Sequence, residues 1–148
     1  MKNFTIFKKE YFDLFTDYGY GVATLAHIMY GLGYDLNNMN SEEAKPKCVE
    51  AVKQLLENDI IHVTLLNNEL YNKKTLTNLE KENILKKIKE IWSYKQPNFE
   101  SIINFEYQNW YLSKIKEEGI NIKTDWKWFS EEFIPNMKKW IEENRPKR

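Results

Sequence analysis

The sequence contains few of the residues that build disulfides, metal sites and phosphate-binding sites. Among 148 residues there is one cysteine, and there are two histidines and two arginines. The single cysteine, Cys48, excludes an internal disulfide framework and is typical of a reducing compartment. Zinc sites need three or four ligands at short spacings, and no such spacing occurs. We therefore expect no metal and no disulfide.

Long apolar runs are also missing. The most apolar stretch, residues 21–32 (GVATLAHIMYGL), is shorter than the roughly 20 residues that span a bilayer, and it contains His27. The first residues, MKNFTIFKKEYFDLF, carry charges and aromatic rings where a signal peptide has a clean apolar segment. These patterns predict a cytoplasmic protein without membrane contact.

Catalytic motifs are absent as well. The sequence has no G-x-S-x-G elbow, P-loop or G-x-G-x-x-G pattern. Cys48 lies within a predicted helix, where a structural role is favoured, and His27 is expected to be a hydrogen-bonded core residue. His62 alternates within a predicted strand and is expected to face solvent or a helix. Asp13 and Asp17 share a helix face that is typical of a solvated surface. We expect neither enzymatic activity nor a cofactor.

The sequence contains enough hydrophobic residues to form one core. Hydrophobic residues make up 42% and aromatic residues 15% of the sequence, and 148 residues is near the commonest domain size. We expect one globular domain over residues 1–148, with residues 144–148 as a frayed tail. The formal charge is zero, from 22 basic and 22 acidic residues. A balanced charge disfavours a dedicated nucleic-acid-binding protein, so nucleic acid is not the expected partner.

Helical periodicity dominates the sequence and predicts a mainly α domain of five or six helices with one small β-hairpin. Glycines 33 and 119 and a Thr77–Glu80 capping box mark helix boundaries, as does a weaker match at Asn40 and Glu43. Ser130 could cap the last helix, which Pro135 would make irregular. Helical spacing from Phe4 onward predicts a first helix that ends at about residue 17. Further helices are expected over about residues 20–32, 44–58, 77–92, 98–118 and 130–143.

The hairpin follows directly on one of these helices. The amphipathic segment 44–58 (AKPKCVEAVKQLLEN) leads into the apolar strand 60–66 (IIHVTLL), and Asn67–Asn68 suits a tight turn before a strand at 69–71. This helix-plus-hairpin is a winged-helix-like unit, a class that contacts nucleic acid or protein. Seven lysines follow it, either as a basic stripe or as a solvated helix face: Lys73, Lys74, Lys81, Lys86, Lys87, Lys89 and Lys95. A winged-helix-like DNA-binding regulator is therefore the alternative function.

All five tryptophans lie after residue 91. Tryptophan and tyrosine dominate binding hot spots, and flanking acids can add specific contacts, although the same rings can simply fill a core. In the segment DWKWFSEEF the rings cannot all be buried on one helical face. A protein interface is accordingly expected around Tyr111, Glu117, Glu118, Asp125, Trp126 and Trp128.

Three segments together resemble a helical family associated with bacterial polymorphic toxins. They are TDYGYGVATLAHIMYGL, AVKQLLENDIIHVTLL and DWKWFSEEF. The chain thus resembles small immunity proteins, including those of contact-dependent growth inhibition. The resemblance implies a cytoplasmic protein-binding module that binds and neutralises a toxin domain. Many nuclease inhibitors of such systems are strongly acidic, and this neutral chain departs from that pattern.

Overall fold

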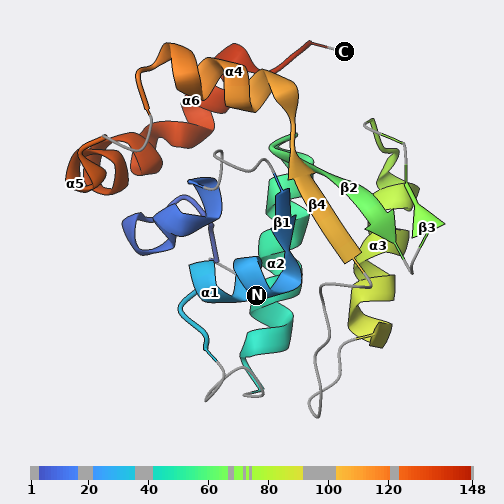
Figure 1. Ribbon diagram of the computed structural model, residues 1–148. Helices are drawn as coiled ribbons and strands as arrows, with labels where there is room; N and C mark the ends of the chain where they lie inside the picture. Colours follow the sequence, from blue (N-terminus) through green and yellow to red (C-terminus); the bar gives the residue numbers. More distant parts are fainter. Residues whose placement is uncertain are drawn as a thin grey trace.

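Four short antiparallel strands and the helices around them make up the described chain (Figure 1). The computed structural model describes residues 4–16, 22–35, 42–66, 69–71, 73, 75–91, 103–120 and 124–147. In chain order, the elements are the 3-10 helix η1 (Lys9–Phe15), β1 (Val22–Thr24), α1 (Leu25–Gly31), α2 (Ala44–Glu57), β2 (Ile61–Leu66), β3 (Glu69–Leu70), α3 (Asn78–Ile91), β4 (Ile103–Tyr107), α4 (Asn109–Glu117), α5 (Trp126–Trp128), the π-helix η2 (Phe129–Phe133), the 3-10 helix η3 (Ile134–Asn136) and α6 (Met137–Asn144).

The predicted fold class is confirmed: the domain is mainly α and carries a small β element. The helix-plus-hairpin unit is present, because α2 leads into β2 and Leu65 of β2 pairs with Leu70 of β3. The turn residues Asn67 and Asn68 lie outside the described residues. The hairpin is half of a four-stranded sheet, ordered β1-β4-β2-β3, so β2 is an interior strand.

The prediction of one helix over residues 98–118 is wrong, because part of this segment forms the strand β4. Residues 103–107 are extended, and α4 begins only at Asn109. Burial alternates along β4, where Ile103, Phe105 and Tyr107 are buried and the two residues between them are half-buried. This period of two is the mark of a strand with two different faces. The pairing with β1 and β2 overrides the helical spacing of the local sequence.

The first two helices also differ from expectation. Residues 4–8 are not helical, and η1 begins at Lys9 as a 3-10 helix. The second helix was expected from about residue 20, but residues 22–24 pair with β4 instead. The helix α1 starts after Thr24, whose hydroxyl accepts a hydrogen bond from the His27 N–H at 3.2 Å. A cap of this kind satisfies one of the otherwise unpaired N–H groups of the first turn.

Several local boundary signals are confirmed. The Glu80 N–H donates to the Thr77 hydroxyl at 3.1 Å, and the Thr77 N–H donates to the Glu80 carboxylate at 3.0 Å. This reciprocal pair is the predicted capping box. Gly33 and Gly119 follow α1 and α4 with φ of 93° and 79°, a left-handed conformation that favours glycine. The other predicted capping box includes Asn40, which lies outside the described residues.

The last helical stretch begins earlier than expected. Asp125, and not Ser130, caps it, because one Asp125 carboxylate oxygen accepts hydrogen bonds from the N–H groups of Lys127 at 3.0 Å and Trp128 at 3.4 Å. The stretch is irregular around Pro135, as predicted, and passes from α5 through η2 and η3 into α6.

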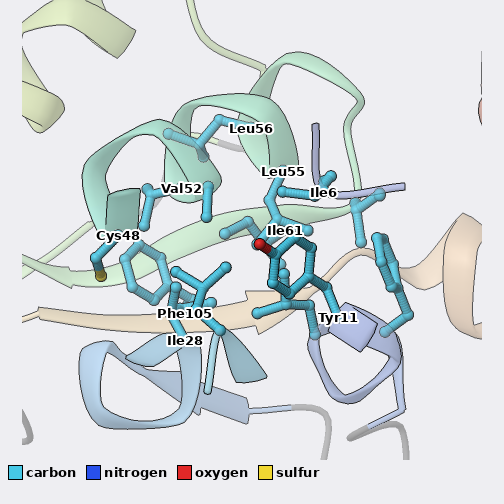
Figure 2. Close-up of a cluster of buried hydrophobic side chains, with 14 of the residues drawn as sticks. Ile6, Tyr11, Ile28, Cys48, Val52, Leu55, Leu56, Ile61 and Phe105 are labelled. Atoms are coloured by element: carbon cyan, nitrogen blue, oxygen red, sulfur yellow. The ribbon is translucent and has the colours of Figure 1, made fainter. Parts of the chain in front are cut away.

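The helix α2 is central to the core. One side of it is fully buried, including Cys48, Val52 and Leu55. Figure 2 shows these side chains meeting Phe105 of β4 and Ile28 of α1. Burial raises the pKa of the Cys48 thiol, which makes it an inert apolar core group.

Gly31 allows α1 to approach η1 closely, and its replacement tests this packing. A Cβ atom at position 31 would lie 2.6 Å from Leu14 Cδ2 and 3.3 Å from the Leu14 backbone nitrogen. Alanine in a helix gains about 0.5–1 kcal/mol over glycine, but overpacking a core costs about 1–3 kcal/mol. Leu14 is fully buried and has little room to move. Gly31→Ala should therefore lower the free energy of unfolding, measured by urea denaturation.

The exposed Ser113 on α4 provides a control, and Ser113→Ala should leave stability nearly unchanged. A Gly31→Ala protein as stable as the parent would show that the contact between η1 and α1 is looser than described.

Candidate protein-interaction surface

The C-terminal helices form a layer at one end of the molecule. Figure 1 shows α4, α5 and α6, coloured orange to red, lying together beyond the sheet. The π-helix η2 packs against η1, and the ring of Trp126 contacts Phe12 of η1 with centroids 6.4 Å apart. This layer carries most of the residues expected to form an interface.

The two tryptophans of α5 point in different directions. Residues two positions apart on a helix do not share a face. The half-buried Trp126 packs on Phe12 and, edge to face at 5.7 Å, on the buried Phe129. Trp128 is 42% exposed. Of the predicted tryptophan pair, Trp126 therefore serves mainly as packing, and Trp128 presents its ring to solvent.

Trp128 is the outer end of a continuous series of aromatic side chains. Its ring lies 5.8 Å from Phe133, which lies 5.4 Å from Trp140, which in turn lies 6.1 Å from Trp110. The last three are half-buried, and the four come from α5, η2, α6 and α4. We call these four side chains the aromatic row. An apolar surface of this kind on a small protein often marks an interaction site.

Hydrogen bonds and stacking fix three of the four rings of the aromatic row. The indole N–H of Trp140 donates to a Glu118 carboxylate oxygen at 3.1 Å, and that of Trp110 donates to the Asp59 carbonyl at 2.7 Å. The Phe133 ring stacks on the buried Phe129 at 5.4 Å. Side chains already fixed in the free protein lose little rotamer entropy on binding. The aromatic row is thus a preorganised apolar surface with polar groups at its margins.

Of the other predicted interface residues, one is buried in the core and the rest are exposed. Tyr111 is fully buried, and its hydroxyl donates to the Phe15 carbonyl at 2.7 Å, so it belongs to the core and is removed from the interface. Glu117 is exposed and pairs with Lys114 at 3.2 Å. The exposed Glu118 borders the aromatic row through Trp140, and the exposed Asp125 caps α5. Phe133, Trp140 and Trp110 were not among the predicted site residues.

A polar groove adjoins the inner end of the aromatic row, beyond Trp110. It encloses about 540 Å³ and is lined by Glu57, Asp59, Glu142, Arg145, Pro146 and Lys147. Asp59, two residues after the end of α2, is in the left-handed region, with φ of 58°. An Arg145 guanidinium nitrogen lies 3.7 Å from the Asp59 carboxylate and donates to the Glu57 carbonyl at 3.1 Å. Residues 144–148 were expected to form a frayed tail. Arg145 departs from this expectation, because its side chain contacts residues at the end of α2.

Both histidines are at least half-buried and lie next to residues of the sheet. His27 is half-buried, and its Nε2 lies 3.4 Å from the Tyr107 hydroxyl, which itself donates to the Leu14 carbonyl at 2.6 Å. His62 is buried opposite Glu106 in the sheet, so of the two predicted surroundings, solvent or a helix, solvent is wrong. Within the described ranges, no three His, Cys, Asp or Glu side chains are placed to hold a metal ion, and no helix is long and apolar enough to span a membrane.

Comparisons with protein-family models, curated proteins and solved structures give no significant match.

The assignment of Tyr111 to the core has a direct test. Tyr111→Phe keeps the ring but leaves the Phe15 carbonyl without this donor in a buried place, which typically costs about 1–3 kcal/mol. The free energy of unfolding, measured by urea denaturation, should fall by that amount. The matched control is Tyr30→Phe on the exposed face of α1, which should have no measurable effect. Equal stabilities for both variants would show that the Tyr111 hydroxyl has no role in the core.

Proposed function

We propose that this protein is an immunity protein, a protein-binding module that binds and neutralises a toxin domain through the aromatic row. The observation that carries the proposal is the exposed ring of Trp128, continuous with three fixed, half-buried aromatic side chains. The toxin as partner is supported by the sequence resemblance to small immunity proteins. A cytoplasmic location belongs to the same proposal.

The chemistry of the aromatic row suits a protein partner. Binding hot spots are enriched in tryptophan and tyrosine and lie within a rim of polar residues that exclude water. Trp128 has the exposure for an anchor, and Phe133 and Trp140 support its position. Glu118 at the margin can add a charge-specific contact that speeds encounter with the partner.

The described geometry favours a protein partner over DNA. A recognition helix must enter the major groove, but α2 has seven buried residues and packs against α1, α3 and β2. The wing strand β3 exposes an acid and an apolar residue, Glu69 and Leu70, neither of which attracts phosphate. Lys73 beside it is paired with Glu80. Two lysines of the predicted basic stripe, Lys74 and Lys95, lie outside the described residues.

Replacing Trp128 should weaken partner binding without unfolding the protein. Truncating a hot-spot tryptophan costs about 2 kcal/mol or more, so Trp128→Ala should raise the dissociation constant about 30-fold. Its melting temperature should stay within about 2 °C of the parent, because the ring is largely at the surface. Calorimetric titration against a toxin domain, sought among the products of the neighbouring genes, measures the first quantity, and thermal unfolding measures the second.

Two other variants separate binding from stability. The exposed acid Glu82 lies on α3, away from the aromatic row, and Glu82→Ala should change neither quantity appreciably. Trp126→Ala should lower the melting temperature by several degrees, because its ring packs on Phe12 and Phe129. If Trp128→Ala binds the toxin domain as tightly as the parent, the contact surface lies elsewhere.

Growth rescue tests the immunity function itself. Expression of a toxin domain found in this way should arrest a bacterial host, and co-expression of this protein should restore growth. Trp128→Ala should restore it less well at equal protein abundance. A toxin that arrests growth equally with and without this protein would refute the proposal. Steeply salt-dependent binding to duplex DNA would support the regulator in its place.

A further inference from the structure

Four segments converge on the side chain of Lys47. Its ammonium lies 5.8 Å from the ring centroid of Phe4, 5.7 Å from that of Tyr11 and 5.9 Å from that of Tyr34. The rings come from the N-terminal segment, from η1 and from the residues after α1, and Lys47 itself lies on α2. We call these three rings the aromatic cage. It shares no residue with the aromatic row.

Several contacts that do not involve Lys47 hold the cage rings in place. The side-chain amide of Gln54 donates to the Phe4 carbonyl at 3.0 Å and accepts from the Ile6 N–H at 2.9 Å. The Tyr34 N–H donates to the Met29 carbonyl at 3.0 Å, in the turn that ends α1. The rings of Phe4 and Tyr11 also pack against each other at 5.7 Å. The cage should therefore keep its shape when Lys47 is shortened.

The environment of the cage favours a positive charge. Burial opposes the charge on Lys47, but a hydrogen bond with the Tyr11 side chain and the nearby Glu43 carboxylate help to outweigh it, and the pKa of Lys47 is raised. Tyr11 and Tyr34 are themselves more than nine-tenths buried. A cation in the cage is thus partly shielded from water, the condition under which cation–π attraction is strongest.

The cage is wide for the group that it holds. All three distances lie near the ~6 Å limit of cation–π contact. A primary ammonium carries only hydrogens and leaves space between its nitrogen and each ring. Methyl groups on the nitrogen would fill that space and bring the spread positive charge into contact with the ring faces. A quaternary ammonium is also less strongly hydrated than a primary one, so its transfer from water costs less.

We propose that Phe4, Tyr11 and Tyr34 form a binding site for a quaternary ammonium group, such as that of choline or trimethyl-lysine, and that Lys47 occupies this site in the free protein. Lys47 is half-buried on a flexible four-carbon stem, so it can withdraw toward solvent when a better-fitting cation enters. Because the empty cage is only a fraction of the population, the parent protein binds the ligand more weakly than a protein without Lys47.

The experiment is a titration of choline into the full chain, followed by nuclear magnetic resonance of the tyrosine rings and by calorimetry. Lys47→Ala should bind choline with a dissociation constant on the order of millimolar. The parent should bind at least about tenfold more weakly. The uncharged isostere 3,3-dimethylbutan-1-ol should bind Lys47→Ala at least about tenfold more weakly than choline, because it lacks the charge.

Two variants serve as controls. Lys53 lies on the same helix and is exposed beside Glu57, so Lys53→Ala should bind choline no better than the parent. Tyr34→Leu, added to Lys47→Ala, should abolish binding.

Two outcomes with Lys47→Ala overturn the proposal. A folded Lys47→Ala that binds no choline shows that the rings do not form a site, and equal binding of the isostere shows only an apolar cavity. If Lys47→Ala does not fold, the parent decides the question at higher choline concentration. The rings of Tyr11 and Tyr34 must then shift with choline and not with the isostere.

Discussion

The position of β4 between β1 and β2 is the constraint on which the rest of the structure depends. The strand brings segments about 40 and about 80 residues earlier in the chain to its two edges. Its pairing continues past its end, where the Gln108 N–H donates to the Ile60 carbonyl at 2.8 Å. The helix α4 therefore starts in a fixed direction directly after the sheet. Tyr107 and Tyr111 then reach back to η1 with their hydroxyls, and Trp110 reaches the end of α2.

Signals that depend on neighbouring residues could be predicted from the sequence. The Thr77–Glu80 box and the two left-handed glycines are local structures, because the groups that bond are only a few residues apart. The strand β4 could not be predicted in this way. A short apolar run fits a helix or a strand equally well, and the distant partners at β1 and β2 decide between them.

The candidate site shows the same division. The sequence indicated that DWKWFSEEF could not bury all its rings, and the 42% exposure of Trp128 agrees with this. It could not show which tryptophan would be exposed, because that depends on where η1 places Phe12. Tyr111 was predicted to lie at the surface. The sequence around it gives no sign of its burial, because the carbonyl that accepts its hydrogen bond is 96 residues away. Phe133 and Trp140 were missed because the aromatic row is completed by Trp110 of α4, which is distant from them in the sequence.

The side chain at position 54 must both give and receive a hydrogen bond in order to attach the N-terminal segment to α2. An amide can do this, because its nitrogen donates to the Phe4 carbonyl while its oxygen accepts from the Ile6 N–H. An ionised glutamate has no donor and a lysine has no acceptor, so each would leave one of the two backbone groups unpaired. Asparagine has both groups but a shorter stem. Substitution at this position is therefore limited by the chemistry of a single functional group, although Gln54 lies on a helix whose other half-buried positions carry charged side chains.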